Sequence, residues 1–552
     1  MSSGTEDRVI FQQPTQFWGN HAGAAQNAAA RESLSLRRAT HAADRLGARL
    51  ARHLVSILYY PEPFYNGGLV AIFRDDAEPF VDLIAEAYKC VPQGLFLHCL
   101  RRGELNELCL PSFNWLHVLN RHVQLSYRVK LTGTTLFGAD LRDEVALPAD
   151  PQVLLDAHIE SCAHFMRNHG ALRLLAAGKY SELIKRIDWQ IRCLMSTALL
   201  GRADWDAPLE EIPARFGEAY ADEQLQRLWG ELRELERSIN PQTDDSWRPA
   251  AFEAAWIFEC FLRRLRAYAS PQSIQSSEAL PEAEQLAGPA TISIEVAEYK
   301  RAVDDFLRDL RQLGEDVVSV ILYGSIARGQ IVRGRSDLLD GYVFLRDQVF
   351  EEKARFLRAL GVMVESCQTL CQTGIRFHPY HYFARSEASL SPAMYLAHWQ
   401  SNQTSAVLMG ADIRAQIRST ERSRATAATS FFEARRTMAH PLAAYLNLQD
   451  WSADDQHKIV HRLTSLKKHI CEMACITLEI PKAASQAVVA LEQVLPLDFS
   501  VLQRIESFSH ASGSLETRTS LRETLRDMLS FVEDLHDRII EARPLNSFVT
   551  RP

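Results

Sequence analysis

The chain has 552 residues, 47% of them hydrophobic, and a formal net charge of −8 at pH 7. A chain of this length exceeds what one hydrophobic core usually serves, so we expect several domains. Basic and acidic residues are interspersed without a long basic tract, which disfavours a nucleic-acid partner. Apolar runs stay below the roughly 18 residues of a membrane span and the first residues lack a signal-peptide pattern, so we expect a cytoplasmic protein without a membrane partner.

The ten cysteines include no Cys-x-x-Cys pair. Cys367 and Cys371 are four residues apart, as are Cys471 and Cys475, so each pair would lie on one helical face. We interpret them as small apolar packing residues in a reducing compartment rather than as zinc ligands.

The first half of the chain predicts a sheet domain followed by helices. Residues 1–45 are Ala-rich and polar and predict a helical extension. Residues 46–150 predict a small mixed sheet, because Val55–Tyr59 and Leu69–Phe73 are β-branched and apolar runs that suit buried strands. Residues 151–269 then show apolar residues at mixed three- and four-residue spacing, which predicts a helical bundle.

The second half repeats this plan. Residues 270–291 are rich in Ser, Pro, Gln and Glu, with little to bury, and predict a linker. Residues 292–420 predict a second sheet domain, and residues 421–552 predict a C-terminal helical bundle. The expected fold class is therefore α+β, with two tandem mixed-sheet domains that are each followed by an α-helical bundle.

Three pairs of segments support the repeat, and they match in chain order: Val55–Tyr59 with Ser319–Tyr323, Leu69–Asp75 with Gly341–Asp347, and Leu136–Arg142 with Leu408–Arg414. The last pair is nearly identical residue for residue. Because Asp140 and Asp412 occupy the same place in it, we interpret both aspartates as parts of a structural turn.

One segment of the second sheet domain carries the strongest functional signal. Val317–Tyr323 is a β-branched and aromatic run typical of a buried strand. Gly324 and Ser325 end it with a turn whose backbone amides can approach an anion closely. The next residues predict the start of a helix that points at the same anion, with Arg328 adding positive charge.

Two carboxylates, Asp337 and Asp340, follow this turn and precede an apolar run. Oxygen ligands beside a phosphate cradle suit a hard cation such as Mg²⁺. With Tyr323-Gly324-Ser325 and Ser336-Asp337, the segment resembles the polymerase-β-like nucleotidyltransferase superfamily, whose signature is an apolar residue, Gly-Ser, a short spacer and Asp-apolar-Asp. The continuation to Gly329 resembles the minimal and antibiotic-modifying branches of that superfamily.

The resemblance implies a chemistry and a set of site residues. It makes Asp337 and Asp340 the catalytic and metal-binding residues, which hold Mg²⁺ against the triphosphate of ATP. It also implies nucleotide contacts from four residues near them: Gly324, Ser325, Arg328 and Ser336. The implied reaction moves a nucleoside monophosphate, in the first place AMP from ATP, to a hydroxyl or amine of a small-molecule or protein acceptor.

The spacing of the two acids departs from the family pattern. The family places them two residues apart, so that strand alternation aims both at the same metals, whereas Leu338 and Leu339 separate Asp337 from Asp340 here. A β-bulge at Leu338 to Gly341 would return both carboxylates to one site. The alternative is a metal site that has decayed.

A third carboxylate, which the family draws from a later strand, is missing at the corresponding place. His378 and His381 occupy that segment instead. A neutral imidazole can ligate a metal or act as a base near neutral pH. The alternative is that both histidines are hydrogen-bonded within a partly buried strand.

The C-terminal bundle contains a short basic stretch that includes Arg462, Lys467 and Lys468. Related enzymes use lysines of the bundle to hold the triphosphate, so Lys467 and Lys468 are candidate nucleotide ligands. Arg462 with His469 also resembles a short Arg–His ribonuclease pattern of helical domains associated with minimal nucleotidyltransferases. A solvated basic helix face explains the same residues without any function.

The first copy lacks the features of a nucleotide site. Tyr60-Pro61 stand where Gly324-Ser325 stand in the second copy, and the stretch that follows has no aspartate. Proline removes an amide donor, and metal ligands are absent. We therefore expect the first copy to be catalytically inactive and to bury one face of the second copy.

Two further interpretations compete with a nucleotidyltransferase. In the first, both copies have lost catalysis and the protein is a nucleotide-binding regulator or scaffold, which the displaced second acid favours. In the second, the fold keeps ATP binding and activates an acceptor in a biosynthetic reaction. The pattern names neither the acceptor nor the oligomeric state.

Overall fold

The structure is a computed structural model that describes residues 28–542 with several gaps: 63–64, 93–94, 110–124, 149–150, 201, 203–204, 206, 208–209, 239–246, 270–293, 328, 330, 332–340, 376, 378–379, 388–404, 415–420, 481–486 and 509–514. No helix within the described ranges combines the length and the apolar content that a membrane crossing needs.

The first half contains a four-stranded mixed sheet. Its strands lie in the order β3-β2-β1-β4 and have these bounds: β1 (Leu54–Glu62), β2 (Tyr65–Phe73), β3 (Phe96–Arg101) and β4 (Thr134–Gly138). β1 is antiparallel to β2 and to β4, whereas β2 and β3 are parallel and are joined through α3 (Phe80–Cys90). α2 (Ala28–Leu50) leads into β1.

The second half repeats this sheet. The order is β7-β6-β5-β8, with β5 (Val317–Tyr323), β6 (Gly341–Leu345), β7 (His381–Ala384) and β8 (Ser405–Gly410). The strand directions match those of the first sheet, and α14 (Lys353–Gln372) joins the parallel pair β6 and β7. α12 (Ala297–Leu310) precedes β5 and buries residues at helical spacing: Tyr299, Ala302, Val303, Phe306 and Leu310. Two mixed sheets among helices confirm the expected α+β class.

Helices follow each sheet along the chain. After the first sheet come α5 (Gln152–Phe165), the π-helical segment η5 (Met166–Leu172), α6 (Arg173–Ala176), α7 (Tyr180–Ala198), α8 (Ile212–Ala219), α9 (Glu223–Ser238) and α10 (Trp247–Ala269). After the second come α16 (Glu421–Ala434), the π-helical segment η11 (Arg435–Ala439), α17 (His440–Leu446), α18 (Ala453–Thr477), α19 (Ala487–Val494), α20 (Ser500–Ser507) and α21 (Leu515–Ala542).

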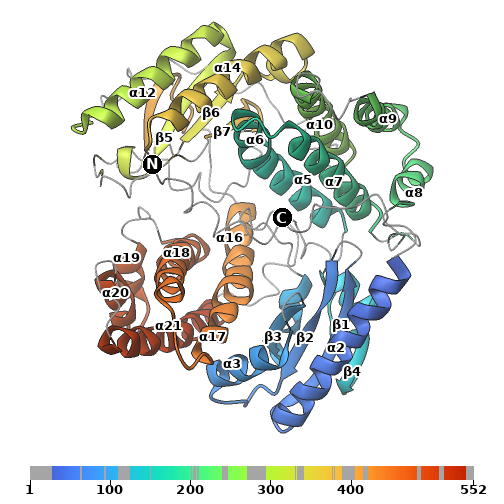
Figure 1. Cartoon of the computed structure of the whole chain (residues 1–552), viewed down its shortest axis with the longest axis vertical. Helices are drawn as coiled ribbons and strands as arrows, with labels where there is room; N and C mark the ends of the chain where they lie inside the picture. The colour runs from blue at the N-terminus through green and yellow to red at the C-terminus, as the bar shows by residue number, and fades with distance from the viewer. Residues whose placement is uncertain are drawn as a thin grey trace.

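The two halves pack crosswise, which the sequence did not predict. One hydrophobic core joins α5, α7 and α10 of the first half to β5, β6, α12 and α14 of the second half. Another core joins α2, α3 and the first sheet to α16, α18 and α21. Figure 1 shows the same exchange: the green helices lie beside the yellow second sheet, and the orange and red helices lie beside the blue first sheet. The first half does bury a face of the second sheet, but its helices do so rather than its own sheet.

Strand pairing corrects the sequence match between the two copies by one residue. Ser56 pairs with Gly138, and Ser319 pairs with Gly410, so Ser56 corresponds to Ser319. Tyr60, and not Tyr59, is therefore the counterpart of Tyr323. The error arose because runs of aliphatic residues ending in tyrosine match in two registers, and only strand pairing distinguishes them.

The Gly-Ala-Asp-x-Arg turns after β4 and β8 have the same structure. Arg142 donates to Asp140, with Nε 2.9 Å from Oδ1, and to the Gly133 carbonyl oxygen at 2.8 Å. Arg414 donates in the same way to Asp412 at 2.8 Å and to the Ser405 carbonyl oxygen at 3.1 Å. These bonds tie the turn to the start of its own strand and support a structural role for both aspartates.

Each crosswise interface contains a matching buried ion cluster. In one, Arg167 of η5 pairs with Glu259 of α10 at 2.7 Å and with Glu387, just after β7, at 2.6 Å. In the other, Arg435 of η11 pairs with Glu533 of α21 at 2.6 Å and with Glu104, just after β3, at 2.9 Å. Both arginines are almost fully buried, so each helical bundle is fixed to the opposite sheet by a charge that has no access to water.

Glu104 and Glu387, the carboxylates beside the two sheets, accept equivalent backbone hydrogen bonds. Glu104 accepts from the Arg101 backbone N–H, and Glu387 accepts from the Ala384 backbone N–H, both at 2.9 Å. The two glutamates therefore occupy equivalent places after the third strand of their sheets. The repeat extends from the strands to the buried charges that join the halves.

Candidate functional site

A glycine turn is present at the end of β5, where the sequence predicts a turn that faces a phosphate. Gly324 has a φ of +81°, a backbone conformation that favours glycine, and it opens the single helical turn α13 (Gly324–Ala327). Ile326 is buried and anchors this turn against the core. Gly324 and Ser325 keep part of their surface exposed, as a ligand-binding turn requires.

The neighbouring strand begins directly after the two aspartates. Gly341 starts β6 and pairs with Leu322, two residues before Gly324. A Cβ at position 341 would lie 2.9 Å from the Ile321 carbonyl oxygen, so the close approach of the strands favours glycine there. The chain thus returns to the end of β5 immediately after Asp340.

Several predicted site residues lie outside the described residues: Arg328, Ser336, Asp337, Asp340 and His378. The bulge expected at Leu338 to Gly341 also falls there, except for Gly341 itself. From Gly341 onward β6 pairs regularly with β5 as far as Ser319. The roles of the two aspartates therefore stay predictions.

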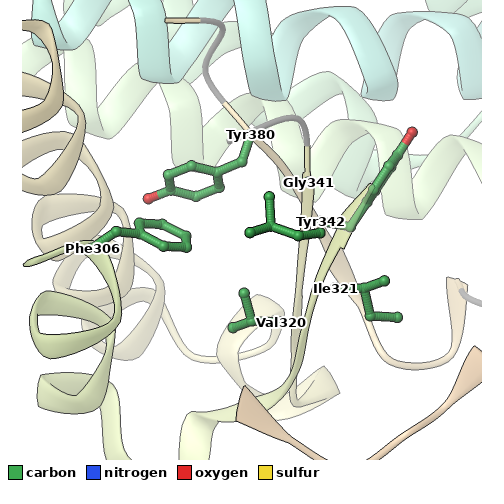
Figure 2. Close-up of a pocket in the computed structure, with 7 residues that line it drawn as sticks. Phe306, Val320, Ile321, Gly341, Tyr342 and Tyr380 are labelled. Atoms are coloured by element: carbon green, nitrogen blue, oxygen red, sulfur yellow. The ribbon is translucent and has the colours of Figure 1, made fainter. Parts of the chain in front are cut away.

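A small cavity lies near this strand start but cannot hold a ligand. Phe306, Val320, Leu322 and Tyr380 are among the residues that line it, and the space is too small for a water molecule. Figure 2 shows Phe306 and Tyr380 on one side of the strands, with Tyr342 on the other side. The cavity is part of the packing between α12 and the sheet.

His381 is embedded in the interface with the first-half helices. Its ring is buried and stacks on His164 of α5 with the ring centroids 3.9 Å apart, and its Nε2 lies 3.1 Å from Asn168 Nδ2. The Tyr342 ring lies on it at 5.1 Å. These contacts support the interpretation of His381 as a hydrogen-bonded residue of a buried strand.

The basic residues of the C-terminal bundle lie on α18, whose apolar side packs into the core that contains the first sheet. Lys467 pairs with Glu506 at 2.5 Å and donates to the Leu502 carbonyl oxygen at 2.8 Å. The Lys467 ammonium group is thus already paired within the bundle. Arg462 and Lys468 are exposed. The crosswise packing removes the reason for expecting these residues beside the second sheet.

The first copy differs from the second at the point where the turn would be. β1 continues through Pro61 to Glu62, which pairs with Tyr65 of β2. With Tyr60 as the counterpart of Tyr323, Pro61 and Glu62 hold the positions of Gly324 and Ser325, one residue later than expected from sequence. The pairing of β1 with β2 therefore extends past the position at which β5 ends in the second copy.

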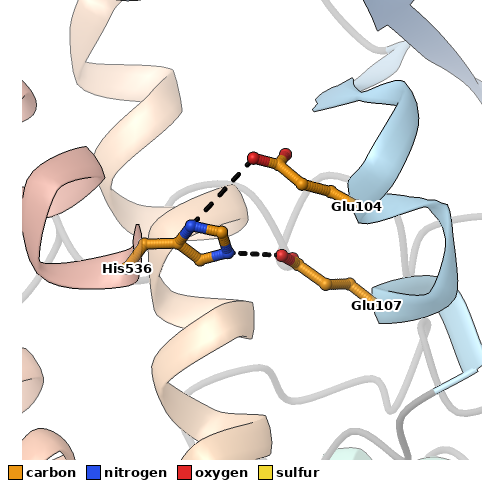
Figure 3. Close-up of side chains that lie close together, drawn as sticks. All are labelled: Glu104, Glu107 and His536. Carbon is orange, nitrogen blue, oxygen red and sulfur yellow. Dashed lines mark hydrogen bonds and ion pairs between the residues drawn. The ribbon is translucent and has the colours of Figure 1, made fainter. Parts of the chain in front are cut away.

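Another polar cluster, which sequence reasoning did not single out, lies between the first sheet and the C-terminal bundle. Glu104 and Glu107 of η2 (Arg102–Cys109) face His536 of α21, and one ligand atom from each lies within 4.8 Å of the others (Figure 3). His536 Nε2 is 2.6 Å from Glu107 Oε1. All three residues are buried and border a cavity of about 320 Å³, which is also lined by Asp75, Glu78, Arg101, Gly103, Asp537 and Ile540.

Neighbouring charges set the protonation of this cluster. Burial and the nearby Arg435 lower the pKa of His536, but attraction to Glu107 and hydrogen bonds to Asp537 and Glu107 outweigh them and raise that pKa to about 9. Burial opposes ionisation of Glu107, yet His536 and Arg435 hold its pKa below the usual value. In the absence of a ligand, His536 is thus an imidazolium paired with a carboxylate.

A sequence signal for this cluster exists. On α21, Leu529, Val532, Leu535 and Ile539 form an apolar stripe, and His536 lies within it. Glu533 adjoins the same stripe. A titratable residue on the apolar side of a long helix predicts a buried partner, although the sequence does not say which one.

Comparison of the chain with protein-family models, with curated proteins and with solved structures yields no match.

Proposed function

We propose that the second sheet domain transfers a nucleoside monophosphate, in the first place AMP from ATP, to a small-molecule or protein acceptor in a Mg²⁺-dependent reaction. One observation carries this proposal. Gly341, the residue after Asp340, pairs with Leu322 beside the turn at Gly324. The phosphate-facing turn and the strand that follows the two acids are thereby neighbours, which is the arrangement that the motif requires.

The two aspartates and the glycine turn would have different roles in this reaction. Asp337 and Asp340 would hold Mg²⁺, and the turn at Gly324 and Ser325 would fix the β- and γ-phosphates. Mg²⁺, when bound, would neutralise the charge that develops on the α-phosphate and on the leaving pyrophosphate. Positioning of the acceptor against the α-phosphate would account for most of the remaining rate enhancement.

The surroundings of His381 favour a second candidate, a nucleotide-binding regulator without catalysis. The strand position from which the family draws its third acid is occupied by a histidine that already contacts His164 and Asn168. A base for the acceptor hydroxyl would then have to come from elsewhere. Binding of ATP without turnover would distinguish this candidate from an active enzyme.

The test is the variant Asp337→Ala in the full chain. We expect it to abolish Mg²⁺-dependent ATP binding, measured by titration calorimetry, and to abolish pyrophosphate release. Asp304→Ala, which removes an exposed acid on α12, is the matched control and should behave as wild type. Unchanged ATP affinity and turnover in Asp337→Ala would refute the site, whereas binding without turnover in the wild type would favour the regulator.

A further inference from the structure

The repeat provides an internal control for the cluster at Glu104, Glu107 and His536. Glu533 and Glu259 are equivalent, because each is the helical partner of its buried arginine. Three residues further along each helix stand His536 in one copy and Leu262, also buried, in the other. A leucine therefore suffices to pack this interface, so a histidine there needs another explanation.

Glu107 shows the same difference. It stands three residues after Glu104, whereas Leu390 stands three residues after the equivalent Glu387. Both copies share the arginine and its two glutamates, but among the described residues at these equivalent positions the first-sheet interface alone adds a buried glutamate and a histidine that contact each other. Glu107 and His536 are therefore not needed for the arginine–glutamate cluster that both interfaces share.

The cluster also contains more negative than positive side chains. Among the described residues, three guanidinium groups (Arg101, Arg435 and Arg436) adjoin five carboxylates: Glu104, Glu107, Glu433, Glu533 and Asp537. Even with His536 protonated, carboxylates outnumber the positive side chains of this cluster. Buried charges need compensation, and a cation from solution can supply it.

An unpaired carboxylate oxygen and an adjoining cavity also favour a metal ion at this cluster. Glu107 is fully buried, and its Oε2 has no hydrogen-bond partner, the Arg436 Nε lying 4.0 Å away. All three candidate ligand residues line the cavity of about 320 Å³, which has room for water molecules that would fill the remaining coordination positions. The ligand atoms lie within 4.8 Å of one another, close enough to coordinate a common ion beside this cavity.

We propose that Glu104, Glu107 and His536 bind one divalent cation of the first transition row, such as Mn²⁺ or Zn²⁺. Two carboxylate oxygens and one imidazole nitrogen suit these borderline cations better than Ca²⁺ or Mg²⁺, which favour oxygen ligands alone. Arg435, 2.9 Å from Glu104 and 3.3 Å from Glu107, orients both carboxylates from the bundle side as an outer partner. On binding, the cation takes the place of the imidazole proton, which is released to water.

The three ligands do not belong to the proposed Mg²⁺ site at Asp337, so one titration can examine both. The full chain is treated with a chelator and titrated with MnCl₂, and free Mn²⁺ is measured by electron paramagnetic resonance. We expect Asp337→Ala to retain one Mn²⁺ site. Adding His536→Leu, which copies Leu262 of the other interface, should weaken that site at least about tenfold, and adding Glu107→Gln should do the same.

His41→Leu, an exposed position on α2, is the matched control and should leave the Mn²⁺ affinity unchanged. Circular dichroism checks that each variant is folded. Absence of Mn²⁺ binding to folded Asp337→Ala protein would overturn the proposal, and so would equal affinity in the His536→Leu and Glu107→Gln variants. Failure of the nucleotide proposal alone would instead appear as an Asp337→Ala protein that still binds and turns over ATP.

Discussion

At the residue scale, the buried charge of Arg167 makes its partner Glu387 essential for stability. Arg167 is 2% exposed and lies over the Phe350 ring at 5.1 Å, so water cannot solvate its charge if a carboxylate is removed. We expect Glu387→Ala to lower the free energy of unfolding by about 3–5 kcal/mol, measured by urea denaturation. Glu218→Ala, which removes an exposed partner of Arg215, should change it by less than about 0.5 kcal/mol.

The same pair predicts a pH dependence. Burial opposes ionisation of Glu387, but Arg167 and Arg266 overcome it and lower the pKa to about 2 from an ordinary value of 4.5. Because the pKa is depressed in the folded state, the stabilisation is complete above pH 4.5 and is lost as the pH falls through about 2. The stability difference between wild type and Glu387→Gln should shrink over that window, and a difference that stays constant would contradict the ion pair.

At the scale of elements, glycine sets how β5 pairs with β8. Gly410 has a φ of +81°, and a Cβ there would lie 2.1 Å from the Val318 carbonyl oxygen; Gly138 meets Val55 in the same way in the first sheet. We expect Gly410→Ala to destabilise the second sheet by at least about 1–3 kcal/mol in denaturant unfolding. Gly361→Ala on α14, where nothing lies within 4 Å, should stabilise the helix by about 0.5–1 kcal/mol. A neutral Gly410→Ala would show that the strand can shift.

At the scale of the whole molecule, the crosswise cores predict that neither half is stable alone. The second sheet shares its core with α5, α7 and α10, so residues 292–552 expressed by themselves expose that surface. We expect this fragment to aggregate or to unfold without cooperativity, and we expect co-expression with residues 28–269 to yield a soluble complex, as in a domain-swapped dimer. Gel filtration and thermal unfolding decide this, and a monodisperse, cooperative C-terminal fragment would contradict it.

The sequence by itself predicted the local features well. Hydrophobic runs indicated the strands that became β1, β2, β5 and β6, and the glycine at position 324 indicated the turn that ends β5. The near-identical strings ending at Arg142 and Arg414 indicated a duplicated turn, which the structure contains. These features depend on neighbours in the chain, so their causes are visible in the sequence.

Only the tertiary structure decided which surfaces meet. An amphipathic helix specifies that one side is buried, but not whether its own sheet or the other copy's sheet covers that side, because both offer similar apolar faces. The sequence around Arg167 and Arg435 therefore did not indicate that each arginine has a partner in the opposite half. It also did not indicate that His536 contacts Glu107, which lies 429 positions away in the chain. Composition and periodicity determined the elements and the duplicated sheet, whereas the pairing of complementary buried charges and apolar faces determined the exchange of helices and the cluster at Glu104.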